Sequence, residues 1–223
     1  AGAEAVNPHA FAEDDGNFVH LGRLPHPDNL AVSWGKQLST LLKMAFFCGA
    51  ESAASNNRII RTTKEYVNNY TQDVTNIFVI IGWSTWEREE WVIDDVYYQI
   101  NTSGSDIVPE DYVGKYKEYV TNVNWRHKTN QAHKDIIELH KWLEDKNIKH
   151  IFFNGNNTFD QIQTKFDFGT TYIEPYNKNF SYNEYLTGEG MLPVVFNSYH
   201  FGADGHSLWA KYLLKYIIKN NLI

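Results

Sequence analysis

Two histidines stand six positions apart near the end of the chain, in the stretch FNSYHFGADGHSLWAKYLLKYI of residues 196–217. His200 lies in a loop directly before an expected helix, where an imidazole can act as a general base. Asn197, three residues earlier, could orient that imidazole by accepting a hydrogen bond from one ring nitrogen. His206 falls in the first helical turn, where the positive end of the helix dipole disfavours a charged imidazolium. We therefore expect a neutral, structural His206 and a chemical role for His200, with a capping or solvated His200 as the alternative.

A serine follows an apolar stretch in the segment GWSTW. Ser84 at that place matches half of the Gly-x-Ser-x-Gly nucleophile elbow, in which a serine stands on a sharp turn between a strand and a helix. Trp86 occupies the position of the second glycine, where a bulky side chain would obstruct that turn. Ser84, Asp160 and His200 still follow the chain order of an α/β-hydrolase triad. We keep that catalytic set as an alternative.

Arg88 lies in the charged segment EREE, directly after this serine. Its guanidinium could bind an anionic or sugar group of a ligand, or the segment could be a solvated charge cluster. His133 and His140 are seven positions apart on one expected helix, about 10 Å along its axis, which is too far to share a metal ion. The histidines near the start of the chain have no ligand spacing either. We therefore expect no metal site.

The overall composition excludes several classes of protein. The net charge is −7 and the chain has no run of Lys and Arg, so it lacks the basic surface that binds a nucleic-acid backbone. Its apolar stretches are far shorter than the roughly 20 residues that cross a bilayer, and the first residues do not resemble a secretory signal. A hydrophobic content of 43% with 15% aromatic residues is typical of a compact globule. We expect a soluble protein with no nucleic-acid or membrane partner.

The pattern of apolar residues predicts helices that alternate with buried strands. The helices show apolar residues at helical spacing behind a capping residue, as after Ser33 and Ser55. The strands are continuous β-branched and aromatic runs, which are typical of strands buried on both faces of a parallel sheet. The expected helices cover residues 33–45, 55–70, 126–146 and the chain from about 203 onward, and the expected strands are AFFCGA, TNIFVIIGW and IKHIFFNGN.

This alternation predicts an α/β fold in which a doubly wound parallel sheet lies between helices. We expect one domain over residues 1–223. Residues 1–30 are expected to form an extended N-terminal loop, and residues 86–112 an aromatic insertion with partly extended structure.

Ligands of a parallel sheet bind beyond the carboxyl ends of its strands. Chemistry is therefore expected just after Gly49, Gly82 and Asn154, where the expected strands end. Cys48, the only cysteine, is expected to be a buried and unreactive thiol beside the first of these positions.

Three segments resemble characteristic blocks of the SGNH (GDSL-type) hydrolases. HFGADGHSLWAKYL, residues 200–213, resembles the last block, in which Asp-x-x-His precedes small residues, Gly-His and the final helix. AESAASNNRIIRTT, residues 50–63, resembles the second block, in which a glycine followed by Ser-Asn opens a helix. VIIGWSTWERE, residues 79–89, resembles the third block of members from bacteria and their viruses. The resemblance spans about residues 33–220 and implies a three-layer α/β/α fold with a flavodoxin-like parallel sheet.

The resemblance also implies roles for individual residues. His200 is the catalytic base, and Asn197 stands where the family has its triad acid. Ala53 stands at the oxyanion glycine, and Ser84 or Thr85 at the oxyanion asparagine. No metal or organic cofactor is needed for this chemistry. The block residues expected to contact substrate are Ser55, Asn56, Trp83 and Arg88.

The sequence departs from the family pattern at the nucleophile and at the acid. The family's serine nucleophile follows a first strand, whereas this sequence opens with AGAEAVN, which resembles the segment directly behind such a serine. We therefore expect the serine either to lie upstream or to be missing. An amide at Asn197 cannot stabilise imidazolium by charge, and in a Ser-His-Asp triad that change costs about 10⁴ in turnover.

Two functions follow from the resemblance. The first is a serine ester hydrolase that removes an acyl group, such as O-acetyl, from a carbohydrate or a small ester. The second is a catalytically inactive SGNH-fold component, structural or glycan-binding, of a larger assembly such as a phage particle. In that case its many tyrosine and tryptophan side chains would contact sugars or other protein subunits. The protein is accordingly expected to be cytoplasmic or virion-associated.

Overall fold

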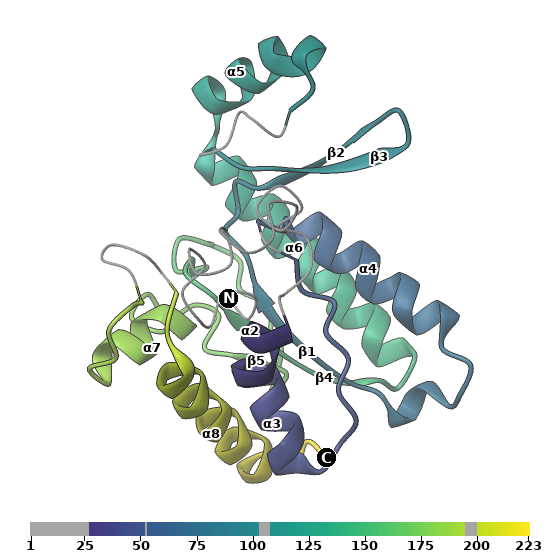
Figure 1. Ribbon diagram of the computed structural model, residues 1–223, viewed down its shortest axis with the longest axis vertical. Helices are drawn as coiled ribbons and strands as arrows, with labels where there is room; N and C mark the ends of the chain where they lie inside the picture. The colour runs from purple at the N-terminus through teal and green to yellow at the C-terminus, as the bar shows by residue number, and fades with distance from the viewer. Residues whose placement is uncertain (1–26, 52, 103–107, 195–199) are drawn as a thin grey trace. The chain divides into compact units, whose positions relative to one another are not determined.

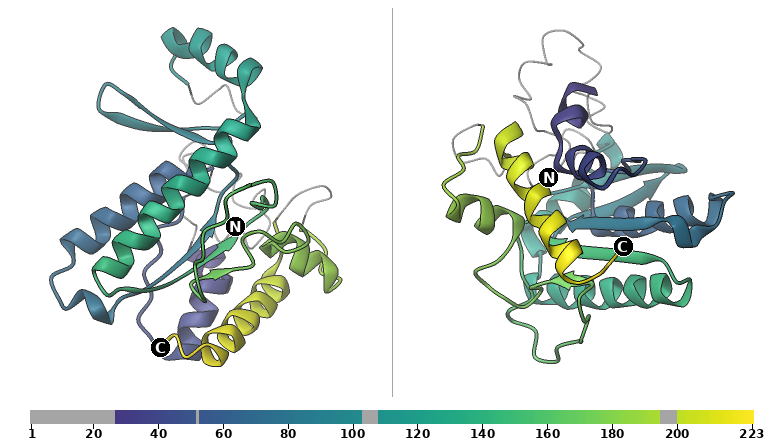
Figure 2. Two further views of the ribbon diagram at one scale, coloured as in Figure 1. Left: turned by 180° about the vertical axis from the view of Figure 1, so that it is seen from behind. Right: turned by 90° about the horizontal axis from the view of Figure 1, so that it is seen from below.

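The computed structural model describes residues 27–51, 53–102, 108–194 and 200–223. The chain forms two compact units, Ala53–Lys178 and the combination of Ala1–Ser52 with Asn179–Ile223. We call Ala53–Lys178 the sheet unit and the other the helical unit. Figures 1 and 2 show the elements of each.

The sheet unit contains a parallel sheet of three strands in the order β1–β4–β5 (Figure 1). The strands are β1 (Phe78–Trp83), β4 (Lys149–Asn154) and β5 (Tyr172–Ile173). Trp83 pairs with Asn154, so the carboxyl ends of β1 and β4 lie side by side. Every residue of the central strand β4 after Lys149 is buried, which agrees with its continuous apolar sequence.

Helices α4 (Asn56–Asn69) and α6 (Trp125–Asp145) pack against one face of this sheet, side by side (Figures 1 and 2). Ser55 caps α4 by accepting a hydrogen bond from the N–H of Arg58, and Asn124 caps α6 in the same way. Apolar residues three or four positions apart give each helix one side that packs into the core. The core between helices and sheet includes Val67, Ile81, Trp83, Ile136, Leu139, Leu143, Phe152 and Tyr172.

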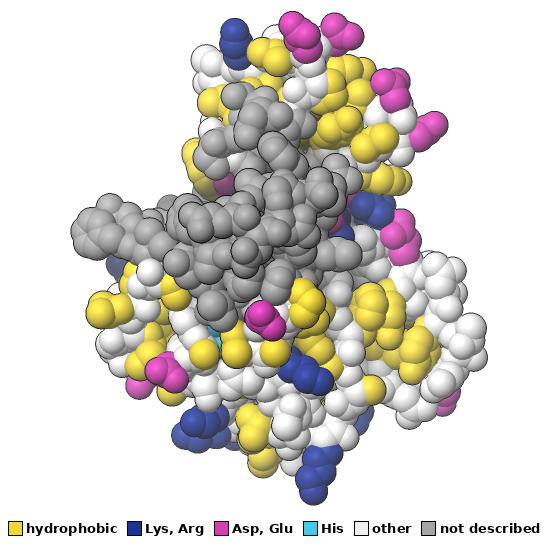
Figure 3. Space-filling view, viewed as in Figure 1, with side chains coloured by type: hydrophobic (Ala, Val, Ile, Leu, Met, Phe, Trp, Pro, Cys, Tyr) yellow, Lys and Arg dark blue, Asp and Glu magenta, His cyan; other side chains and the backbone are white. Residues whose placement is uncertain are grey.

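A β-hairpin follows β1 in the chain and consists of β2 (Glu89–Ile93) and β3 (Val96–Ile100). Asp94 and Asp95 form its turn with φ angles of 48° and 62°, as in the two-residue turns that match the twist of the strands. One face of the hairpin packs against Tyr116 of α5 (Val113–Asn122). Figure 3 shows hydrophobic side chains at the surface of this region. The short helices η2 (Val74–Asn76) and η3 (Glu110–Tyr112) complete the unit.

The helical unit contains α2 (Pro27–Val32), α3 (Trp34–Leu42), α7 (Tyr182–Gly188) and α8 (Ala203–Lys219). Helix α8 packs against α3 and α7. Ser33 caps α3 by accepting from the N–H of Lys36, and Lys43 ends it in a left-handed conformation. The apolar face of α8 buries Trp209 completely, and its ring stacks on that of Tyr212.

The expected α/β class is confirmed in its coarse form, because a small parallel sheet is flanked by helices. The long helices, the strands β1 and β4 and the two serine caps are also confirmed. β2 and β3 supply the extended structure expected within residues 86–112. The described sheet has three strands, so the three-layer flavodoxin-like arrangement stays a prediction. None of the described helices is both long enough and apolar enough to cross a membrane.

The strand expected at AFFCGA, residues 45–50, is wrong. This segment follows α3 without regular structure, Phe47 is 62% exposed and Cys48 is only half-buried. A short apolar run has no period that distinguishes a buried strand from an exposed connection. A site just after Gly49 was expected because a strand should end there, and the absence of that strand removes the reason for it. The expected loop of residues 1–30 is also wrong from Pro27 onward, where α2 begins, while residues 1–26 lie outside the described part of the chain.

Candidate functional site

The turn before α4 has the conformation that suits a glycine. Ala53 adopts a φ of 57°, in the left-handed region that few residues other than glycine occupy. Ser55 follows as the helix cap, and its own N–H donates to Oε1 of Gln99 over 2.9 Å. The left-handed turn and this hydrogen bond fix the direction of the main chain from Ala53 to Ser55.

Asn56 connects the start of α4 to the loop after β1. Its Nδ2 donates to the carbonyl of Ser84 over 3.2 Å, and its Oδ1 accepts from the N–H of Ser84 over 2.9 Å. The Asn56 side chain is buried. One amide therefore satisfies both main-chain groups of Ser84 and holds the loop against the N-terminus of the helix.

The loop after β1 is held by further polar contacts. Nη1 of Arg88 donates to Oγ of Ser84 over 2.9 Å. Thr85 donates from its hydroxyl to the Glu87 carboxylate, and Tyr119 donates to the Glu87 carbonyl over 2.6 Å. Burial and the nearby carboxylates raise the pKa of Tyr119, so its hydroxyl stays protonated as the donor. The guanidinium of Arg88 is thereby placed beside Ser84 at the carboxyl end of β1.

The structure places the predicted substrate residue Trp83 inside the core. Its side chain is 1% exposed and packs edge-on against Phe152. Gly155 donates its N–H to the Trp83 carbonyl, and a Cβ at Gly155 would lie 2.7 Å from that oxygen. The close approach of the two strand ends therefore requires glycine. Because the Trp83 ring is buried, we leave it out of the site.

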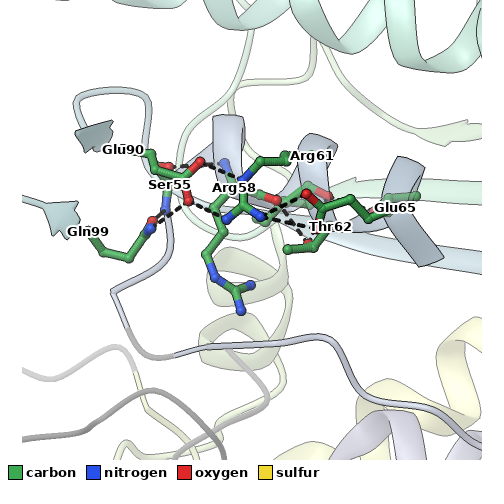
Figure 4. A network of polar contacts seen from close by, with 9 residues as sticks. Ser55, Arg58, Arg61, Thr62, Glu65, Glu90 and Gln99 are labelled. Carbon is green, nitrogen blue, oxygen red and sulfur yellow. Dashed lines mark hydrogen bonds and ion pairs between the residues drawn. The ribbon is translucent and has the colours of Figure 1, made fainter. Parts of the chain in front are cut away.

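A chain of hydrogen bonds connects the hairpin to the turn before α4 (Figure 4). Nε2 of Gln99 donates to Oε1 of Glu90 over 2.8 Å, and Glu90 accepts two hydrogen bonds from Arg61 of α4 at 2.9 and 2.7 Å. Glu65 pairs with the same guanidinium, and the two carboxylates, Glu90 above all, raise the pKa of Arg61. The Arg61 guanidinium also lies over the ring of Tyr97, 3.8 Å from its centroid.

The sequence did not predict the contributions of Gln99, Glu90 and Arg61. Glu90 and Gln99 lie in EEWVIDDVYYQI, where polar and apolar residues partly alternate around an Asp-Asp pair that suits a hairpin turn. That pattern could have indicated two paired strands with Glu90 and Gln99 on one face, where the register indeed pairs them. It could not have indicated that this face contacts α4.

His200 lies in the helical unit, three residues before Ala203, the first residue of α8. It is half-buried, and its carbonyl accepts a hydrogen bond from the N–H of Val194 over 2.8 Å. Phe201 forms a bridge to Pro193 and is buried, which fixes the main chain beside the imidazole. Asn197, its expected partner, lies outside the described residues.

His206 is confirmed as a neutral structural residue. It is fully buried, and its Nδ1 accepts a hydrogen bond from the N–H of Trp34 over 3.1 Å. This contact requires an unprotonated Nδ1. Burial, the largest cause, lowers the pKa of His206 to about 4, which keeps the ring neutral at pH 7.

Three buried histidines of the sheet unit form what we call the histidine cluster: His133 and His140 on α6, and His150 on β4. His140 Nδ1 lies 2.8 Å from His150 Nε2, and His133 Nε2 lies 2.7 Å from the Tyr176 hydroxyl. Within the described part of the chain, we find no group of three or more His, Cys, Asp or Glu side chains arranged to hold a metal ion.

Five of the predicted residues gather at one place in the sheet unit. We call Ala53, Ser55, Asn56, Ser84 and Arg88 the turn site. Asp160, the acid of the alternative triad, instead accepts hydrogen bonds from Thr158 and Gln161. The turn site is rich in main-chain groups and has one cation, which suits it to bind an oxyanion or another electron-rich oxygen.

Comparisons with known proteins give a family but no activity. Neither the curated proteins nor the solved structures contain a match to this chain. A family model described as "Family of unknown function (DUF6071)" matches residues 26–174, which is more than half of the sequence. The chain therefore belongs to DUF6071, a family of unknown function.

Proposed function

We propose that this protein is an SGNH-type carboxylic ester hydrolase that removes a small acyl group, such as O-acetyl, from a carbohydrate. The observation that carries the proposal is the left-handed turn at Ala53, two residues before the capping Ser55. The resemblance to SGNH hydrolases puts an oxyanion glycine at that position. A left-handed main chain there is what a glycine would supply, although the residue is alanine.

The proposed reaction assigns one task to each group. The serine nucleophile that the resemblance implies attacks the acyl carbon, and His200 accepts its proton. Asn197 orients the His200 ring. The N–H of Ala53 donates to the oxyanion of the tetrahedral intermediate. Collapse of that intermediate expels the alcohol, which takes the proton back from His200, and water then hydrolyses the acyl-enzyme.

Ser84 fits a supporting role better than the oxyanion role expected for it. Its N–H already donates to Asn56, and its hydroxyl accepts from Arg88. The proposal therefore relies on Ala53 as the main-chain donor. Arg88, beside Ser84, supplies the positive charge that would bind a carbohydrate oxygen or an anionic substituent.

The engagement of Ser84 also favours the second candidate, a catalytically inactive module that binds glycans within a larger assembly such as a phage particle. Both donor and acceptor groups of Ser84 are used inside the protein, and an amide stands in place of the triad acid at Asn197. A binding module needs the turn site and Arg88 but no working base.

Hydrolysis of p-nitrophenyl acetate and of acetylated sugars by the product of the full reading frame separates the two candidates. For the hydrolase, His200→Ala should lower kcat by about 10²–10⁴. His127→Ala, which removes an exposed histidine from α6, should leave kcat unchanged. Turnover that survives His200→Ala would overturn the proposal. A wild-type protein that hydrolyses neither substrate but is a stoichiometric part of purified virus particles would establish the second candidate.

A further inference from the structure

We infer that Gln99 is a positioning residue: its side-chain amide holds the main chain of Ala53–Ser55 in the conformation that presents an oxyanion donor. This inference rests on the proposed function. Gln99 belongs to the hairpin strand β3 and is separated from Ser55 by 44 positions in sequence. It would act on the reaction only through the turn, without touching the substrate.

The hydrogen bond from Ser55 to Gln99 is buried. Gln99 is 8% exposed and Ser55 is fully buried, and the N–H of Ser55 donates to Oε1 of Gln99 over 2.9 Å. The N–H groups of a helix N-terminus have no partner within the helix. Gln99 therefore satisfies a buried donor that would otherwise be left without an acceptor, which links the position of the turn to the hairpin.

The orientation of the Gln99 amide follows from its other partner. Its Nε2 lies 2.8 Å from Oε1 of Glu90, and a carboxylate only accepts hydrogen bonds. A flipped amide would place Oε1 against that carboxylate and Nε2 against the donating N–H of Ser55. Both contacts would then be repulsive, so only the observed orientation satisfies both neighbours.

Arg61 fixes Glu90 in turn. The two hydrogen bonds from its guanidinium to Glu90 are bidentate, and the Glu90 side chain is 7% exposed (Figure 4). A bidentate, partly buried pair has a narrower geometry than an exposed pair of charges. The donations therefore converge on Glu90: Ser55 donates to Gln99, Gln99 donates to Glu90, and Arg61 donates to Glu90 from the other side.

Loss of this support should reduce catalysis more than substrate binding. Donors to an oxyanion must lie within about 0.5 Å of their productive position. Displacements of about 1 Å can lower the rate by 10². The turn carries Ala53, whose N–H would bind charge that develops only in the transition state, so its displacement should lower kcat with little change in KM.

The test uses Gln99→Leu and a variant in which the side chains of residues 90 and 99 are exchanged, in the full-length protein. Gln99→Leu and Gln99→Glu should each lower kcat about tenfold or more, with KM within about twofold. In the double variant Gln99→Glu/Glu90→Gln, residue 99 accepts from Ser55 and from the new amide, and the amide oxygen accepts from Arg61. The swap keeps an acceptor for the Ser55 N–H and a matched link between residues 90 and 99, and it gives up one of the two Arg61 hydrogen bonds, so kcat should recover most of the loss seen in Gln99→Glu.

Two controls separate positioning from general destabilisation. Ile136→Val removes a methyl group from the core far from the hydrogen-bond chain in sequence, and Glu65→Gln removes the exposed partner of Arg61. Both should keep the wild-type kcat. The inference is overturned if a folded Gln99→Leu keeps the wild-type kcat. It is also overturned if Gln99→Leu and Ile136→Val, compared at equal thermal stability, have the same kcat.

Amide hydrogen exchange at Ser55 tests the same contact without substrate. Gln99→Leu should speed exchange of the Ser55 N–H at least tenfold, and Ile136→Val should not. Unchanged exchange in Gln99→Leu overturns the inference even if the protein is an esterase. Fast exchange in Gln99→Leu, together with a wild type that hydrolyses no ester, would instead refute the proposed function and with it the catalytic role of Gln99, while leaving the contact to the turn in place.

Discussion

The turn site and the histidine cluster lie in the same unit and use polar side chains in opposite ways. In the turn site, side chains bind main-chain groups: Asn56 binds both main-chain groups of Ser84, and Gln99 binds the N–H of Ser55. In the histidine cluster, side chains bind one another among aromatic rings. The rings around it belong to Phe152, Phe159, Phe166, Phe168, Tyr172 and Tyr176.

The hydrogen bonds of the histidine cluster join its members to one another or to neighbouring groups. His150 Nδ1 lies 2.9 Å from the carbonyl of Ile148, so it carries a proton and leaves Nε2 as an acceptor. His140 Nδ1 then donates to that Nε2. Burial lowers the pKa of both histidines, which favours this neutral arrangement. Three imidazoles that could do chemistry therefore serve the packing of α6 on β4.

The comparison teaches that residue type is a poor guide to chemistry in this fold. The turn site contains no histidine, yet it contains the left-handed turn and the ordered main-chain groups that a charged oxygen requires. The histidine cluster contains the residue most often used for acid–base catalysis, yet its members are buried, with His140 bonded to His150 and His133 bonded to Tyr176. Substitutions in the histidine cluster should therefore lower stability, and substitutions in the turn site should change main-chain geometry.

The largest effect is expected for Phe152→Ala in the core beside the histidine cluster. Phe152 is fully buried, at 0% exposure, and packs against Trp83, His150 and Tyr172. Its truncation should lower the free energy of unfolding by about 3–5 kcal/mol, because apolar contacts are lost and a cavity remains.

The free energy of unfolding can be measured by urea denaturation of the two proteins at pH 7. Phe47→Ala is the matched control, since Phe47 is 62% exposed, and it should cost under about 1 kcal/mol. A Phe152→Ala protein as stable as Phe47→Ala would show that this core is not packed as the contacts indicate.

The fold was predictable where one sequence pattern had one structural solution. Ser33 and Ser55 stand directly before amphipathic stretches, so caps and helices followed from local chemistry. Two continuous apolar segments, TNIFVIIGW and IKHIFFNGN, predicted strands, and the structure shows them as the neighbouring parallel strands β1 and β4. β5 has only two residues, Tyr172 and Ile173, and such a short strand has no sequence pattern of its own.

The turn site was predictable only through the resemblance to a family. The resemblance identified Ala53, Asn56 and Arg88 as members of characteristic blocks. It did not predict that Asn56 binds the main chain of Ser84 or that Arg88 donates to the Ser84 hydroxyl. Those contacts depend on where β1 ends relative to α4, which is set by the packing of the core. Gln99 was missed for the same reason, because its partner Ser55 is distant in sequence.

An intermediate effect is expected for Asn56→Ala in the turn site. The substitution leaves the N–H and the carbonyl of Ser84 without their present partner, and it should lower the free energy of unfolding by about 1–3 kcal/mol. Asn68→Ala, at an exposed position of the same helix, should change it by less than about 0.5 kcal/mol. Urea denaturation gives both values, and equal stabilities would contradict the assigned role of Asn56.

The smallest effect is expected for Glu144→Gln beside the histidine cluster. Glu144 lies 3.2 Å from Nε2 of His140, one helical turn away, and its side chain is 56% exposed. Burial, the largest cause, lowers the pKa of His140, and the Glu144 carboxylate partly opposes that change. A histidine with a lowered pKa in the folded state contributes stability above its unfolded value of about 6.5, and this stability is lost as the pH falls through the folded value.

Removing the carboxylate should therefore lower the pKa of His140 further and make the loss of stability in acid larger. Because Glu144 is more than half exposed, solvent screens the pair, and the extra loss at pH 5 should be only about 0.3–0.5 kcal/mol. A nuclear magnetic resonance titration of the His140 ring measures the pKa directly. Glu138→Gln removes the same charge from an exposed position of α6 and should leave that pKa unchanged. A pKa of His140 that rises in Glu144→Gln would mean that the Glu144 carboxylate does not stabilise the protonated ring.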